Sequence, residues 1–449
     1  MRANRLGVLT CTVLIAMAPT ARAENLLEIY QLAQQSDPTW NGAQANYRAN
    51  LELWPQARSL LLPTISAGAG IFKVDQEATR SDQVSGTIIG TSSARYTSTG
   101  YNVQFTQPLF NMSGFAAYTQ GHSAVNQAEA ELAIARQDLI QRTAQAYFDV
   151  LAAQDALEFA RTEKNAIKGQ LDLAQRNYSV GNATVVDVHE ARARHDQAMA
   201  LEVSAESDLQ VKQETLITLT GVTPATPLAR PTARLQLPAP EPADPEHWIK
   251  AASEQNLQIK VQEYLYNIAS AEVRKVRGGH YPTLDLVAGR VYSDAGGGVF
   301  GTGIESTTDQ IGLQLQVPIY QGGYVSSKGR EAVARREQAR EALTLSKRQT
   351  TRQAREAFLA VTSGATRVHA LEQALASSQK ALEGTLLGYE SGVRTGVDVL
   401  NAQRELYRTK RDLSQARYTW LTSRLRLKAA IGTLNDADLA EINSFLAQG

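Results

Sequence analysis

The stretch "YESGVRTGVDVLNAQ", residues 389–403, repeats a stretch that lies 211 positions earlier, "YSVGNATVVDVHEAR", residues 178–192. Seven of the fifteen positions are identical in the two copies. Each copy carries Thr-x-x-Asp shortly after a glycine, which is typical of a turn that leads into a capped helix. We therefore expect two helix–turn–helix units, in which Thr184 and Thr395 cap the second helix.

Long proline-free segments surround both turns, from Leu109 to Thr223 and from Ile319 to the C-terminus. They are rich in residues with high helix propensity, and their small or apolar residues recur at alternating spacings of four and three. This coiled-coil spacing predicts a helix from about Phe115 to Tyr178, on the order of 100 Å long. In the first copy the spacing is carried by Leu139, Thr143, Ala146, Val150, Ala153, Leu157 and Ala160, and it recurs 211 positions later.

Two short segments of a different character precede the long helices. In residues 101–107 and 311–317, apolar side chains alternate with Gln, Asn, Thr or Gly. This period of two predicts strands with one apolar face and one polar face. Each segment has an upstream partner of similar character, at 64–72 and 283–292, so we expect two β-hairpins. Prolines are expected at the four junctions between hairpins and helices: Pro63, Pro108, Pro282 and Pro318.

The first 23 residues have the features of a secretory signal peptide. Arg2 and Arg5 precede an apolar run, and "ARA" at 21–23 is a small-x-small cleavage site, so we expect the mature chain to start at Glu24. Without this peptide the chain carries 42 basic and 45 acidic residues, and a net charge of about −3 argues against nucleic-acid binding. The single cysteine, Cys11, lies within the peptide, which excludes disulfides and thiolate metal sites from the mature chain.

The mature chain is expected to be an internal duplication with a linker between its halves. The linker, "PATPLARPTARLQLPAPEPADP", holds seven of the fourteen prolines and belongs to an equatorial region. Each repeat comprises a helix, a hairpin, a long helix, a turn and a further helix. The expected limits are 24–223 for the first repeat, with hairpin 64–107 and turn 178–187; 224–245 for the linker; and 246–449 for the second repeat, with hairpin 283–317 and turn 389–398.

The strands indicate a membrane protein. An apolar face opposite a face lined by Gln is the pattern of a transmembrane barrel wall. The mature chain has no run of the roughly 18 apolar residues that a membrane-spanning helix needs. Four strands cannot close a barrel alone, because their edges would leave backbone groups unpaired in lipid. We therefore expect an α+β membrane protein that pools the hairpins of several copies.

Several motifs resemble those of the TolC-type outer-membrane channels: "ENLLEIYQLAQQSDP", "LLPT", "VPIYQGG", "GYESGVRTGVDVLNAQRELY" and "AAIGTL". The resemblance covers residues 24–449 in the right order. It implies a homotrimer in which each subunit gives four strands to a twelve-stranded barrel, continued through the periplasm by an α-helical barrel. It also implies an exit duct in the outer membrane of a Gram-negative bacterium, used for type I protein secretion or for efflux of small toxic molecules. The implied partners are a periplasmic adaptor and an inner-membrane transporter, either ABC-type or proton-driven.

The resemblance also implies roles for residues of the two turns. Tyr389 would bond Asp187 within the subunit, and Arg394 would reach the Asp187 region of the neighbouring subunit, so that these residues lock the closed state. Asp398 would form an acidic selectivity ring at the narrowest point. Asn401 stands where the type member has a second acid of this ring, which implies a weaker ring here. On the residues alone, Asp187 and Asp398 fit equally well as groups that cap helices, and the two roles are compatible.

Three further patterns have plainer explanations. "GGGVFG" at 296–301 lies between two strands, whereas a dinucleotide site needs a strand before it and a helix after it, so we expect a surface loop. His189 and His195 are six positions apart and do not have the i, i+4 spacing of a helical zinc site. The basic run 330–355 is expected to be a solvated or lumen-facing helix surface rather than an anion site.

The sequence contains no nucleophile–base pair or metal-ligand pattern, so we expect neither enzymatic activity nor a cofactor. Trp420 lies in the middle of a predicted long helix, and nothing in the sequence accounts for it. The alternative to a channel is a periplasmic coiled-coil adaptor or scaffold without a pore. Such a protein has no need for hairpins with an apolar face, which favours the channel.

Overall fold

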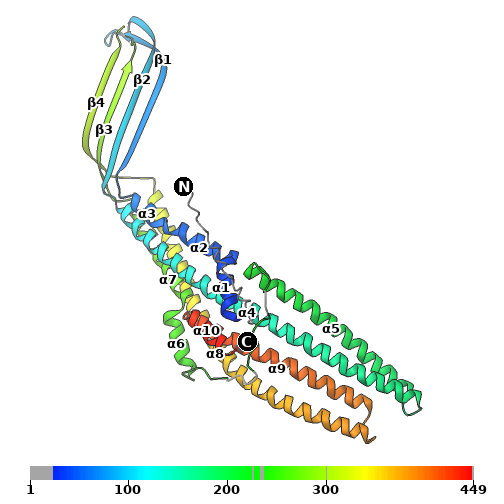
Figure 1. Ribbon diagram of the computed structural model, residues 1–449. Helices are drawn as coiled ribbons and strands as arrows, with labels where there is room; N and C mark the ends of the chain where they lie inside the picture. Colours follow the sequence, from blue (N-terminus) through cyan, green and yellow to red (C-terminus); the bar gives the residue numbers. More distant parts are fainter. Residues whose placement is uncertain (1–23, 225–226, 233–236, 300, 447–449) are drawn as a thin grey trace, which may run out of the picture.

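The computed structural model describes residues 24–224, 227–232, 237–299 and 301–446. The expected signal peptide lies outside the described residues, as do residues 225–226 and 233–236 of the expected linker. The molecule is long, with a β-sheet at one end and two helical hairpins at the other (Figure 1). None of the helices in the described ranges combines the length and the apolar character needed to cross a bilayer.

Four antiparallel strands form a single sheet in the order β1-β2-β3-β4. The alternating segments 101–107 and 311–317 lie within the second and the fourth strand. The central pair, β2 with β3, joins the two halves of the chain, and Tyr101 lies opposite Tyr292 with ring centroids 5.1 Å apart. The bounds are β1 Thr64–Ser81, β2 Ile88–Phe110, β3 Thr283–Ala295 and β4 Ile304–Gln316.

The two faces of the sheet differ in polarity, as the alternating pattern predicts. Residues that lie directly opposite each other across a ladder share a face. One row across the sheet is therefore apolar, and it consists of Ile65, Phe105, Ala288 and Ile311. The next row lies on the other face and consists of Ser66, Gln104, Gly289 and Gln310. Ile65 and Ile311 are 74% and 78% exposed, so the single chain leaves its apolar face uncovered.

Pro108 does not lie at a hairpin–helix junction, contrary to the expectation from the sequence. It is part of β2, which continues to Phe110, and the register with β3 shifts between these two residues. The strand tolerates proline there because β1 starts pairing only at Thr106, so the backbone of Pro108 has a partner strand on one side alone. The other three prolines precede β1, precede β3 and follow β4.

Four long helices form two antiparallel hairpins: α4 (Met112–Ser179) with α5 (Val185–Thr220), and α8 (Tyr324–Glu390) with α9 (Gly396–Ile431). The first rod, expected from about Phe115 to Tyr178, is 68 residues long. The predicted heptad positions between residues 139 and 160 of α4 are buried, including Leu139, Thr143, Val150, Leu157 and Ala160. Ala146 and Ala153 of the same seam are also buried, and their small side chains, like that of Ala160, let the helices approach closely.

The second half of the chain repeats the elements of the first at constant spacing. Helices α5 and α9 both span 36 residues and begin 211 positions apart. Each is followed by a C-cap glycine, Gly221 and Gly432, also 211 positions apart. Before the hairpins the spacing is 219 residues. It relates α1 (Leu26–Ser36) to α6 (Pro245–Gln255), α2 (Pro38–Leu51) to α7 (Leu257–Gly278), and β1 to β3. The change of spacing falls within the hairpins, of which the first is longer.

The halves share one apolar core midway along the molecule, where α1 and α10 (Asp436–Ser444) pack against the long helices; the short α3 (Leu53–Ser59) lies against α4 nearer the sheet. Trp420 belongs to this core and is 1% exposed, which accounts for the residue that the sequence left unexplained. Its ring contacts Phe445 edge-on, with centroids 6.3 Å apart. Gly364 on α8 makes room for it, because a Cβ at this position would lie 3.2 Å from Cδ1 of Trp420.

Candidate gate at the two helical turns

The two helical hairpins end in turns of five residues with the same geometry. We call 180–184 the first tip turn and 391–395 the second tip turn. In each, a glycine with positive φ reverses the chain: Gly181 at +80° and Gly392 at +75°. Glycine adopts this left-handed conformation without the steric cost that a Cβ imposes. The turns therefore explain why the repeated stretch keeps its glycine.

A complete capping box follows each turn. The Thr184 hydroxyl accepts a hydrogen bond from the Asp187 amide at 3.3 Å, and Oδ2 of Asp187 accepts one from the Thr184 amide at 2.8 Å. Thr395 and Asp398 make the same pair at 3.3 and 2.9 Å. The bonds from the Thr395 backbone and hydroxyl hold the pKa of the Asp398 carboxyl below its usual range. Both aspartates thus anchor helix N-termini, whatever else they do.

Tyr389 does not bond Asp187 directly, contrary to the expectation from the resemblance. Its hydroxyl instead accepts a hydrogen bond of 3.4 Å from Nδ2 of Asn177, near the end of α4. Within the described chain, the Asp187 carboxylate accepts its two hydrogen bonds from the amide and the hydroxyl of Thr184. Tyr389 and Asp187 still line the same small cavity, of about 210 Å³, between the two turns. The Asn177–Tyr389 bond links the tips of the two helical hairpins.

Arg394 is exposed and forms no ion pair within the part of the chain that the structure describes. The Cγ of Arg394 lies 2.7 Å from the position that a Cβ on Gly388 would occupy, so the glycine leaves space for the aliphatic part of the arginine side chain. In the first repeat the corresponding positions are Asn177 and Ala183. Asn401, three residues after Asp398 on the same helix face, is also exposed. Because Arg394 is exposed and unpaired in the described residues, its guanidinium is available to a group outside this chain.

Above the tip, polar groups join the two helical hairpins between α4 and α9. Oδ2 of Asp155 accepts hydrogen bonds from the hydroxyls of Ser414 and, at 2.8 Å, Tyr418. Arg230, from the segment between the repeats, lies 3.6 Å from the same carboxylate. Closer to the tip, Leu400 of α9 packs into the apolar cluster of α4 and α5 around Ile167. These contacts hold the second hairpin against the first.

Glu163 of α4 lies at the same junction and is 4% exposed. It forms no ion pair in the described ranges, although Arg411 and Arg404 of α9 lie close enough to act on its charge. Burial raises the pKa of Glu163, and the two arginines offset only part of that rise. Burial also raises the pKa of Tyr407, which faces it from α9. A buried carboxyl without a partner makes this stretch of the junction weak.

Sequence reasoning did not find Asn177, Asp155 or Glu163. Each belongs to a helix rich in polar residues, and each contacts a residue more than 200 positions away. No local pattern distinguishes them from solvated neighbours. Of the two histidines noted in the sequence, His189 is exposed, whereas His195 is partly buried and lies 3.6 Å from the carboxylate of Asp196.

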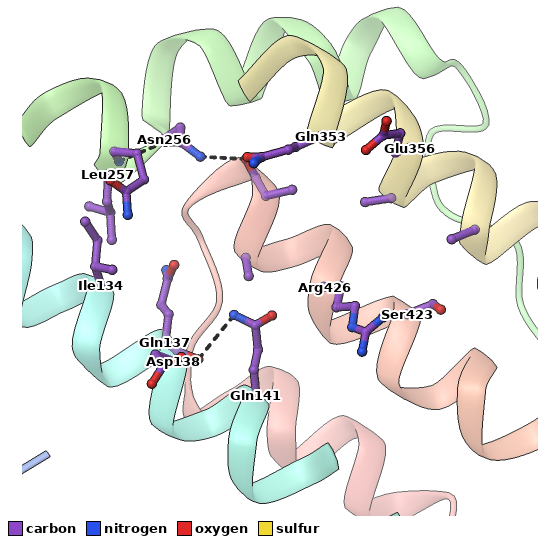
Figure 2. A pocket seen from close by; sticks show the side chains of 15 residues that line it. Ile134, Gln137, Asp138, Gln141, Asn256, Leu257, Gln353, Glu356, Ser423 and Arg426 are labelled. Carbon is purple, nitrogen blue, oxygen red and sulfur yellow. Dashed lines mark hydrogen bonds between the residues drawn. The ribbon is translucent and has the colours of Figure 1, made fainter. Parts of the chain in front are cut away.

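A pocket of about 480 Å³ lies where α4, α7, α8 and α9 meet (Figure 2). Amide side chains line much of it, and two of them, Gln137 and Gln141, follow one another along α4. Arg426 reaches Oε1 of Gln145 at 3.0 Å, and Asp138 is bonded to Arg142. These groups form no nucleophile–base pair, and no cluster of metal-ligating side chains occurs among the described residues.

Comparison with known sequences assigns the chain. Residues 29–222 and 248–433 match the family described as outer membrane efflux protein. The outer membrane protein TolC of Escherichia coli (strain K12) is 32% identical over 452 residues, with 99% of this chain and 89% of the relative covered. The protease secretion protein PrtF of Dickeya chrysanthemi is 28% identical, with 98% and 95% covered. These are outer-membrane and secretion proteins, so they give no support to a periplasmic adaptor.

Solved structures agree on the fold. The outer-membrane protein VceC of Vibrio cholerae superimposes with a TM-score of 0.75 at 20% identity, covering 91% of this chain and 96% of that one. The CmeC channel of Campylobacter jejuni gives 0.78 at 15% identity, covering 94% and 90%. The chain belongs to the outer membrane efflux protein family, and it is an export duct in the outer membrane of a Gram-negative bacterium.

Proposed function

We propose that three copies of the chain assemble into one duct, which opens to the exterior at the sheet and closes at the tip turns. The duct passes proteins, small toxic molecules or both. Relatives with secretion in their names include the protease secretion proteins PrtF and AprF, and a pyoverdine export protein is also similar. The internal duplication and the uncovered apolar face of the sheet support this assembly.

The sheet supplies the argument for several copies. Strands β1 and β4 each have one neighbouring strand in the part of the chain that the structure describes, so each has a free edge there. In lipid, free edges are costly, and twelve strands from three chains close a barrel without any. The apolar row that includes Ile65 and Ile311 would then face lipid, and the row with Gln104 and Gln310 would line the lumen. Arg290 and Asp309, paired at 2.6 and 2.7 Å on the apolar face, would mark its outer limit.

The closed state rests on two kinds of contact at the tip. Within one chain, the Asn177–Tyr389 hydrogen bond ties the end of α8 to the end of α4. Between chains, Arg394 would reach the acidic region around Asp187 of the neighbour. Oδ1 of Asp187 takes no part in the capping box and can accept such a bond. Opening then requires both contacts to break, while the capping boxes keep each turn folded.

Asp398 and Asn401 would face the narrowest part of the duct. In a trimer, Asp398 gives one negative charge per subunit and Asn401 none. We expect cations to be favoured, but less strongly than in a ring with two acids per subunit. We expect no catalysis and no cofactor, and the energy for export must come from partners. These would be a periplasmic adaptor and an inner-membrane ABC or proton-driven transporter.

Single-channel recording tests the lock. Arg394→Ala should raise the conductance of the purified trimer in planar bilayers. Loss of a charge-assisted hydrogen bond, roughly 1.5–3 kcal/mol, shifts a closed–open equilibrium about ten- to a hundredfold. Arg408→Ala on the same helix is the control, because its side chain is exposed and lies three to four turns from the tip. If Arg394→Ala conducts like the wild type, the assignment of the lock is wrong.

Detergent extraction tests the assembly itself. The proposal expects the protein to be extracted from outer membranes as a trimer. Recovery as a soluble periplasmic monomer would instead favour the adaptor. An adaptor has no pore and would show no channel activity.

A further inference from the structure

A pocket of about 660 Å³ lies just below the sheet, where α7 ends, β3 begins and α8 starts. Its lining includes Arg277, His280, Tyr281, Ser326 and Arg330. The first three residues form the end of α7 and the short link to β3, while the last two lie in the first turns of α8. The lining of the pocket therefore includes two arginines, a histidine, a tyrosine and a serine from separate elements.

The two arginines of this pocket have no acidic partner within the described ranges. Neither guanidinium takes part in a hydrogen bond or an ion pair there, and both side chains are exposed. Farther along α8, most of the basic run is neutralised by glutamates, as with Arg335 and Arg352, which pair with Glu331 and Glu356 at 2.8 and 2.7 Å. The excess positive charge at the pocket thus favours an anion.

Exposed aromatic residues place the pocket at the level of a membrane surface. Tyr281 is 52% exposed and stands two residues before β3 begins. The connection from β4 to α8 adds Ile319 and Tyr320, and α8 begins with Tyr324; these residues are 94%, 85% and 64% exposed. Tyrosine is enriched where a membrane protein crosses from lipid to water. The pocket therefore lies at the headgroup level of the leaflet that faces the periplasm.

Helical periodicity indicates the direction in which Arg330 points. Arg330 and Arg355 are 25 residues apart on α8, which is close to seven turns at 3.6 residues per turn. Arg355 pairs with Glu246 of α6 at 2.8 Å, and α6 lies along the flank of the long helices (Figure 1). Arg330 therefore lies on the side of α8 that carries α6, away from the buried positions Thr350 and Ala354.

We propose that this pocket binds the phosphate of an anionic phospholipid in the periplasmic leaflet of the outer membrane. Arg277 and Arg330 would hold the phosphate oxygens, since guanidinium matches phosphate in a bidentate manner and basic pockets at membrane surfaces select anionic headgroups. His280 and the Ser326 hydroxyl add donors, and Val325 contacts the glycerol end. The inference rests on the proposed placement of the sheet in the membrane.

Native mass spectrometry of the full-length trimer in detergent tests the site, with phosphatidylglycerol as the probe and phosphatidylcholine as the neutral comparison. Arg277→Gln combined with Arg330→Gln should weaken phosphatidylglycerol binding about tenfold or more, as expected for the loss of two charge-assisted contacts. The control combines Arg348→Gln with Arg367→Gln. Both of these arginines are exposed on α8, have no ion pair among the described residues and lie away from the pocket.

The control variant should bind phosphatidylglycerol like the wild type. Equal weakening in both variants would overturn the proposal in favour of general charge attraction. Displacement of the lipid by millimolar inorganic phosphate would overturn it in favour of a site for soluble anions. Loss of the trimer in the pocket variant alone would mean that these arginines join subunits.

Conductance of the same preparations in planar bilayers separates the lipid site from the duct. Wild-type trimers that conduct but do not prefer phosphatidylglycerol refute the lipid site alone. If none of the preparations conducts, the proposed duct fails as well.

Discussion

The first and second tip turns have the same length, a glycine in the same left-handed conformation and the same capping box. They differ in side chains that take no part in forming the turn or its capping box. Asn177 and Ala183 of the first repeat correspond to Gly388 and Arg394 of the second. Asn177 reaches across to the second repeat, whereas Gly388 leaves space for the stem of Arg394. The duplication thus keeps the groups that fold the turn and changes those that contact something else.

The same kind of exchange occurs in the core. Gly364 and Trp420 of the second repeat correspond to Ala153 and Leu209 of the first. Trp420 is buried against Gly364, while Leu209 is only partly buried. In both exchanges the second repeat combines a large side chain with a facing glycine. The two halves therefore share the same backbone fold but pack different side chains at corresponding positions.

The largest expected effect concerns Trp420. Trp420→Ala should destabilise the helical part by about 3–5 kcal/mol, the usual cost of removing a large buried aromatic side chain. Leu209→Ala, at the corresponding position, should cost clearly less because the leucine is partly exposed. Thermal unfolding followed by helical circular dichroism measures both. Equal losses would contradict the distinction between the packing of these two corresponding positions.

Tyr389 and Tyr178 allow a matched comparison of the two tips. Tyr389→Phe removes the bond with Asn177, worth roughly 0.5–1.5 kcal/mol, and should raise the open probability of the channel about two- to tenfold. Tyr178 is 50% exposed and has no hydrogen bond through its hydroxyl in the described chain, so Tyr178→Phe should leave the channel unchanged. Recordings in planar bilayers compare the two. A similar gain in both variants would show that the bond has no part in closure.

Glu163 has Ala374 as its counterpart in the second repeat. Its folded-state pKa is raised by burial, so the folded chain favours the protonated form, and this contribution to stability is lost as the pH rises from about 4.5 through the raised pKa. Glu163→Gln should therefore raise the thermal midpoint at pH 7, on the order of 1 °C, and have little effect near pH 4. Glu129→Gln is the control, because Glu129 is exposed on α4 and forms no ion pair in the described ranges. A midpoint that falls at pH 7 would mean that the nearby arginines outweigh burial.

The smallest expected effect concerns Asn401, whose counterpart is Glu190. Asn401→Asp adds one negative charge per subunit near Asp398 and should increase cation selectivity, seen as a shift of the reversal potential in a salt gradient. Glu190→Gln should not shift it, because this residue belongs to the first hairpin and lies near Arg194. The shift should shrink at high salt, since exposed charges are screened. A shift of equal size from both substitutions would contradict the proposal that position 401, and not position 190, affects ion selectivity.

Much of the architecture could be predicted from local patterns. The alternation in 101–107 and 311–317, the heptads of the long rods and the repeated turn correctly indicated a sheet, long helices and a duplication, and the family assignment confirms the fold. The Pro108 junction was wrong, because strand limits depend on which neighbouring strand is present. The expected Tyr389–Asp187 bond is not formed in the described chain. The packing of the two helical hairpins instead brings Asn177 of α4 to Tyr389, whose hydroxyl accepts its hydrogen bond.

The sequence by itself determined what depends on neighbours along the chain: the strand faces, the coiled-coil seams, the glycines of the turns and the Thr184 and Thr395 caps. Only the tertiary structure decided which distant residues meet. It paired Asn177 with Tyr389 and buried Glu163 opposite α9. It also placed Arg330, part of a run expected to be solvated, in the lining of the same pocket as Arg277. The reason is physical. Hydrogen bonds within a turn or helix follow from spacing, whereas contacts between helices depend on how their faces are rotated and packed against each other.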